Sequence, residues 1–206
     1  MRAVILFLAL FLQSASLLLA QPADLDAWVA RAREQFEVPG VAVAIVKDGS
    51  VVLAKGYGVR NLAHPGAVDA HTLFGIASNT KAFTAAALAI LVDEGKLNWD
   101  DPVQKYLPRF ALADAYPSRE VTIRDLLSHR TGLGLGAGDL LYWPDTTFSR
   151  EQVIAAARHL PLASSPRSRY AYNNLCYVVA GEVVAAVSGK RWEDFIHERI
   201  LAPLGM

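Results

Sequence analysis

A hairpin signal in the N-terminal part of the chain is the feature that most constrains the fold. Two runs rich in β-branched residues, 41–47 and 51–59, flank the dipeptide Asp48-Gly49. Both central positions of a type I′ turn need positive φ, and Asp and Gly tolerate it. The sequence therefore predicts two antiparallel strands joined by a tight turn.

Helical patterns surround this hairpin on both sides. Residues 24–37 predict an amphipathic helix that ends before Pro39-Gly40. Beyond the loop at 61–71, helices are predicted after Ser78 up to Gly95, from Thr122, from Ser149 to Leu160, over 175–187 and over 191–201. A hairpin followed by a mostly helical stretch predicts an α+β fold, an antiparallel sheet flanked by helices plus a mostly helical subdomain.

Ser78 and Lys81 are the first candidate catalytic pair. They stand three residues apart at the start of a predicted helix, so both side chains lie on one face. A lysine there can reach the serine hydroxyl, and the positive end of the helix stabilises developing negative charge. A lone S-x-x-K pattern is weak evidence, because serine is also a favoured helix N-cap. Both interpretations remain open on this motif alone.

A second polar segment supports the catalytic interpretation. Tyr172 and Asn174 stand between a polar loop at 164–168 and an apolar helical run. A phenol can shuttle protons, and an amide can hydrogen-bond a substrate. The two helix starts thus carry complementary groups for proton transfer.

Four segments resemble, in order, those of class C β-lactamases and the related serine DD-peptidases and esterases. They read FGIASNTKAFTA at 74–85, LLSHRTGL at 126–133, YAYNNLCY at 170–177 and APLGM at 202–206. In the second segment, Arg130 and Thr131 depart from the commonest residues of that family. The resemblance covers nearly everything after residue 20, and it does not specify a substrate.

The resemblance implies a β-lactamase/transpeptidase-like fold and acyl transfer through a covalent serine ester. Ser78 would be the nucleophile, and Lys81 or Tyr172 would accept its proton. Asn174 would bind the substrate amide or orient Lys81. The Ser78 N–H would be one oxyanion donor. The substrate would be a β-lactam, a D-alanyl peptide or a carboxylic ester, with no cofactor.

The family carries a third motif, K-T-G or H-x-G, on a strand after the APLGM segment, whereas these 206 residues end with that segment, and their H-x-G match, His64-Pro65-Gly66, precedes Ser78. We therefore expect the sequence to represent the N-terminal part of such a domain over residues 21–206, with the sheet incomplete and little activity of its own. Two alternatives stay open. One is a penicillin-binding receptor that deacylates slowly, and the other is an inactive truncated scaffold.

Composition and the N-terminus predict an exported protein. Lys+Arg and Asp+Glu balance at 20 each, so no charge excess indicates a nucleic-acid partner. Arg2 and the apolar stretch after it are typical of a signal peptide over residues 1–20. We expect its removal to give a periplasmic or secreted protein without stable membrane insertion. An uncleaved anchor is the competing interpretation.

The remaining candidate sites are weaker. The glycines at 132, 134, 136 and 138 match no phosphate-binding motif, so a flexible loop is expected. His129 is expected to be a structural, hydrogen-bonded histidine, and the other four histidines lack metal-ligand spacing. Cys176, the single cysteine, is expected to be a buried small hydrophobe.

Overall fold

The computed structural model describes residues 24–206, and the predicted leader at 1–20 lies outside them. The chain forms two compact units that divide after Gly75. Each unit is described by itself below. No helix among the described residues has the length and apolar character needed to span a bilayer.

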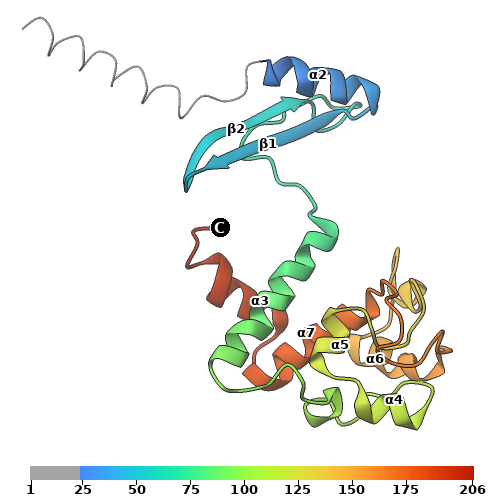
Figure 1. Ribbon diagram of the computed structural model, residues 1–206. Helices are drawn as coiled ribbons and strands as arrows, with labels where there is room; N and C mark the ends of the chain where they lie inside the picture. The colour runs from blue at the N-terminus through green and yellow to red at the C-terminus, as the bar shows by residue number, and fades with distance from the viewer. Residues whose placement is uncertain (1–23) are drawn as a thin grey trace, which may run out of the picture. The chain divides into compact units, whose positions relative to one another are not determined.

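The described part of the first unit, residues 24–75, contains a helix and the predicted hairpin (Figure 1). Its elements are α2 (Leu25–Gln35), β1 (Gly40–Lys47) and β2 (Ser50–Gly58). The strands pair antiparallel with Lys47 opposite Ser50, and a bulge lies between Ile45 and Val46. Asp48 and Gly49 have φ of 50° and 75°, as the two-residue turn requires.

The second unit is helical, as the sequence predicts for this region (Figure 1). Its elements are η1 (Ala77–Asn79), α3 (Thr80–Asp93), η2 (Val103–Lys105), α4 (Ala115–Glu120), α5 (Ile123–Leu127), η3 (Asp139–Leu141), α6 (Arg150–Ala156), η4 (Ala157–His159), α7 (Leu175–Ser188), α8 (Trp192–Ile196) and the π-helical η5 (His197–Leu201). The two units together give the α+β fold class that the sequence predicts.

Local sequence signals account for several helix ends. Thr122 and Asp125 form a reciprocal capping box at the start of α5, and Ser149 and Gln152 form another at α6. Gly95, with φ of 70°, follows the end of α3. The helix predicted to run to Leu160 instead changes to a 3₁₀ turn at 157–159, and the one predicted over 191–201 changes to a π-helical turn.

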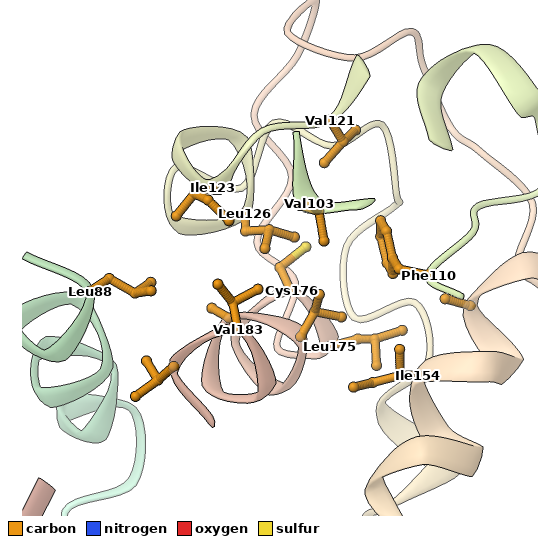
Figure 2. Packing of buried hydrophobic residues seen from close by; sticks show 14 of the residues in the cluster. Leu88, Val103, Phe110, Val121, Ile123, Leu126, Ile154, Leu175, Cys176 and Val183 are labelled. Atoms are coloured by element: carbon orange, nitrogen blue, oxygen red, sulfur yellow. The ribbon is translucent and has the colours of Figure 1, made fainter. Parts of the chain in front are cut away.

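Helix α7 forms the centre of the hydrophobic core. It is apolar around most of its circumference, which is typical of a buried helix. Figure 2 shows Leu175, Cys176 and Val183 of α7 among side chains from the surrounding elements. The neighbours include Leu88 from α3, Ile123 and Leu126 from α5, Ile154 from α6, and Val103, Phe110 and Val121. This packing fixes the position of the start of α7.

Cys176 is a buried core residue, as expected from the sequence. Its side chain is 1% exposed, and its Sγ lies 3.5 Å from Thr131 Oγ1. Burial raises the pKa of the Cys176 thiol to about 11. The thiol therefore stays protonated at neutral pH and is a poor nucleophile.

The core packing predicts a large stability difference between two leucines. Leu126 is 1% exposed, so we expect Leu126→Ala to lower the free energy of unfolding by about 2–5 kcal/mol through lost contacts and a residual cavity. Leu135 is 79% exposed, so Leu135→Ala should change it by less than about 0.5 kcal/mol. Denaturant titration of both variants tests this. Equal losses would contradict the core described above.

Candidate active site

Ser78 lies in a strained turn just before α3. It belongs to the 3₁₀ turn η1, and the preceding Ala77 has φ of 44°. A left-handed conformation is costly for a residue with a Cβ, and such strain is frequent at functional sites. The turn leaves Ser78 exposed, while Lys81 follows in the first turn of α3.

The side chains of Ser78, Lys81 and Tyr172 meet. The Ser78 Oγ lies 2.6 Å from the Tyr172 Oη and 3.0 Å from the Lys81 Nζ. Lys81 Nζ also lies 4.8 Å from the centre of the Tyr172 ring and 5.4 Å from that of Tyr177. The ammonium is therefore flanked by two electron-rich ring faces, a favourable environment for a cation.

Asn174 completes the group of four residues singled out in the sequence. It immediately precedes α7, and its Oδ1 accepts a 2.7 Å hydrogen bond from Lys81 Nζ. The four side chains come from two segments about 90 residues apart in the sequence. The contact between α3 and α7 brings these segments together.

Asn173, between Tyr172 and Asn174, anchors the segment to the interior. Its side chain is fully buried, and its Nδ2 donates to the carbonyl oxygens of Gly134 and Ala137. Its Oδ1 accepts from the Cys176 N–H at 3.1 Å. All the hydrogen-bonding atoms of this amide have partners. The anchor leaves the neighbouring Tyr172 and Asn174 side chains directed at Lys81.

His129 packs against the ring of Tyr172 and hydrogen-bonds to the neighbouring backbone. Its Nδ1 accepts from the Asn173 N–H at 3.1 Å, and its ring centre lies 4.6 Å from that of Tyr172. Burial lowers the pKa of His129, and the positive charge of Lys81 lowers it further. The adjacent Ser128 donates its hydroxyl to the Arg124 carbonyl. His129 is thus the hydrogen-bonded, structural histidine that the sequence led us to expect.

The electrostatics of the cluster favour ionisation of the tyrosine. The Lys81 side chain next to the phenol is the main cause that lowers the pKa of Tyr172. The Ser78 hydroxyl, which is hydrogen-bonded to the phenol, lowers it further. A nearby positive charge stabilises the phenolate relative to the neutral phenol. At a given pH, a larger fraction of Tyr172 is therefore phenolate, the form that can accept a proton, than for an ordinary tyrosine.

A pocket of about 500 Å³ adjoins these side chains. Ser78, Lys81 and Asn174 line it, and the aromatic side chains of Tyr142, Trp143 and Trp192 form much of its wall. Arg150 and Glu182, which pair with each other, also line it. Such a mixture of apolar walls and a few polar groups is typical of a small-molecule site.

Asp139 belongs to the site but was not singled out in the sequence. Its Oδ2 accepts from Asn174 Nδ2 at 3.0 Å, and its Oδ1 accepts from Tyr142 Oη at 3.0 Å. The glycine-rich stretch predicted only as a flexible loop leads into the short helix that carries it, η3. The glycine before Asp139, Gly138, was the one signal in the sequence, because glycine often marks a backbone position with positive φ or close packing. It has φ of 89°, and a Cβ there would come within 3.0 Å of Leu160 and Leu175 side-chain carbons.

Within residues 24–206, no three histidine, cysteine or acidic side chains are grouped so that they could hold a metal ion.

Comparison with known proteins identifies the family. The family model described as Beta-lactamase matches residues 25–206. The unguisins hydrolase ungD′ of Aspergillus campestris is 36% identical over 182 residues, which are 84% of this chain and 33% of that protein. The chain thus belongs to the β-lactamase family, and it spans about a third of the length of this relative.

Solved structures show the same fold. The octameric penicillin-binding protein homologue from Pyrococcus abyssi matches with a TM-score of 0.78 and 36% identity, over 89% of this chain and 43% of that one. The D-amino acid amidase from Ochrobactrum anthropi SV3 matches with a TM-score of 0.70 and 30% identity, over 88% and 52%. The β-lactamase/transpeptidase-like fold predicted from the sequence is therefore confirmed.

The proximity of Lys81 predicts an unusual titration of Tyr172. We expect Tyr172 to ionise below the ordinary value of about 10. In Lys81→Met its pKa should rise, because the phenolate loses its neighbouring positive charge. The phenolate difference absorbance of each variant, with Tyr172→Phe as the reference spectrum, measures this.

Lys96→Met provides the matched control for that titration. Lys96 is paired with Glu94, and its replacement by Met removes the same charge elsewhere in the second unit. It should leave the Tyr172 pKa unchanged. An equal shift of the Tyr172 pKa in both variants would show that the net charge of the protein, rather than the contact with Lys81, determines that pKa.

Proposed function

We propose that this protein is a serine hydrolase that works through a covalent acyl-enzyme on Ser78. The observation that carries the proposal is the contact of the Ser78 Oγ with both Tyr172 Oη and Lys81 Nζ beside a pocket. A hydroxyl needs an adjacent proton acceptor to become a nucleophile, and such a contact supplies it. The family membership of the chain supports the same reaction class.

We assign the proton acceptor in this proposal to Tyr172. The Asn174 Oδ1 faces Lys81, so the lysine acts as a donor in that contact. The 2.6 Å separation of Ser78 Oγ and Tyr172 Oη suits a hydroxyl donating to a phenolate, for which about 2.5–2.7 Å is usual. Lys81 then stabilises the phenolate and donates to the serine oxygen.

The proposed reaction begins with attack of the Ser78 Oγ on a substrate carbonyl carbon. The Ser78 proton passes to Tyr172 as the new carbon–oxygen bond forms, and the Ser78 N–H is proposed to donate to the developing oxyanion. Tyr172 returns the proton to the leaving group as the bond to it breaks. A water molecule then attacks the carbonyl carbon of the acyl-enzyme and gives a proton to Tyr172. Tyr172 passes that proton to the Ser78 Oγ as the ester bond breaks and the acid leaves.

The substrate class in this proposal is an activated or ordinary acyl compound, namely a β-lactam, a D-amino peptide or a carboxylic ester. One solved relative is named a D-amino acid amidase, which fits amide cleavage, and a sequence relative is named an unguisins hydrolase, which fits hydrolysis in general. The aromatic walls of the pocket suit an apolar acyl side chain next to the reacting carbonyl.

Covalent labelling tests the nucleophile. The complete gene product should react with a fluorophosphonate or a fluorescent penicillin at Ser78, as mapped by mass spectrometry. Ser78→Ala should abolish the label, whereas Ser128→Ala should retain it because that hydroxyl bonds the Arg124 carbonyl. A label at another serine would refute the assignment. A single burst without turnover would instead identify a slowly deacylating receptor.

The pH dependence tests the roles of Lys81 and Tyr172. We expect Tyr172→Phe and Lys81→Met each to lower kcat/KM by about 10²–10⁴-fold. If Tyr172 accepts the proton, activity rises as its phenolate forms, so Lys81→Met moves the acid limb of the profile to higher pH. If a neutral Lys81 were the base, that limb would disappear in the same variant. A loss below about tenfold for Lys81→Met would indicate a structural lysine.

A further inference from the structure

We infer that Asp139 is a positioning residue that holds Lys81 against Ser78 through Asn174. The inference rests on the proposed function, since it concerns how the same side chains are oriented. A chain of three contacts carries it, from Tyr142 through Asp139 and Asn174 to Lys81.

The chain is directional because its two ends have opposite hydrogen-bonding character. An ionised carboxylate only accepts and an ammonium only donates, whereas the amide of Asn174 does both. With its Nδ2 bound to Asp139 Oδ2 at 3.0 Å, the amide presents its Oδ1 to Lys81 Nζ at 2.7 Å. Rotating the amide by half a turn would place an oxygen against a carboxylate and an NH₂ group against an ammonium. Asp139 therefore selects the orientation that binds Lys81.

Asp139 is itself held in place. Its second oxygen, Oδ1, accepts the Tyr142 hydroxyl at 3.0 Å. Burial is the main cause that raises the pKa of Tyr142, and Asp139 raises it further, so this phenol remains a donor. On the backbone side, Gly138 allows close packing against Leu160 and Leu175. The carboxylate is thus fixed to the start of the same helix that carries Asn174.

The contact with Asn174 affects reactivity by fixing the position of the Lys81 Nζ. Lys81 Nζ donates both to Asn174 Oδ1 and to Ser78 Oγ, and it lies over the Tyr172 ring. Without a fixed acceptor on one side, the flexible lysine would spend less time next to the serine and the phenol. Outer contacts that orient a metal ligand typically contribute about 10–100-fold, and we expect an effect of that order for the contacts that orient Lys81.

Reversing the polar pair gives a sharp test. In Asp139→Asn the new amide can no longer define the orientation of Asn174, and in Asn174→Asp two carboxylates face each other. The double variant Asp139→Asn/Asn174→Asp places the donor at 139 and the acceptor at 174, which restores a hydrogen bond of reversed direction and the original net charge. A double-mutant cycle of this kind measures the coupling between the two sites.

The readout is the rate of Ser78 labelling by a fluorophosphonate at saturating probe, in the complete gene product. We expect Asp139→Asn to lower the maximal rate about 10–100-fold. The half-saturating probe concentration should stay within about threefold, because Asp139→Asn keeps the size and shape of a side chain that lines the pocket. The double variant should regain at least about tenfold over the slower single variant. Asp145→Asn, which removes a carboxylate from the same loop region, is the matched control and should label at the wild-type rate.

Three results would overturn the inference. They are an Asp139→Asn rate within about twofold of wild type, a double variant no faster than the slower single one, or loss of cooperative unfolding in Asp139→Asn, which would mark a structural residue. Absence of Ser78 labelling in the wild type refutes the proposed function instead. Crystal structures then decide the positioning role, because Lys81 Nζ should leave the position-174 side chain in Asp139→Asn and contact the side chain at that position again in the double variant.

Discussion

The packing of α3 against α7 is the constraint on which the rest of the second unit depends. Helix α7 is buried on most sides, so its start can occupy only one position relative to α3. Ser78 and Lys81 lie at the start of one helix, and Tyr172 and Asn174 lie at the start of the other. The hydrophobic core thus determines the separation of the reactive groups, although it contributes none of them.

Polar anchors convert that coarse placement into hydrogen-bonding distances. The buried amide of Asn173 satisfies two backbone carbonyls and one N–H, and His129 accepts the N–H of the same residue. Each bond fixes the backbone on either side of a reactive side chain. Because unsatisfied buried polar groups are costly, these anchors resist rearrangement. The result is a preorganised cluster in which Lys81 has defined neighbours.

Much of this arrangement follows from local sequence signals. Asp48-Gly49 predicted the hairpin turn, and the capping boxes at Thr122 and Ser149 predicted two helix starts. The juxtaposition of Ser78 with Tyr172 was expected from two helix starts and from the family resemblance. Asp139 was missed, because an isolated acidic residue after alternating glycines has no periodicity or motif. Its significance lies only in the direction of the Asn174 amide.

The sequence by itself determined the hairpin, the main helices, the family and the residue types of the candidate site, since these depend on neighbours along the chain. The tertiary structure decided which of these groups contact one another. It placed Tyr172 rather than His129 at hydrogen-bonding distance from Ser78, and it directed the Asn174 oxygen towards Lys81. Such choices depend on distances of a few tenths of an ångström between segments far apart in sequence. Only the packed core and its polar anchors define them.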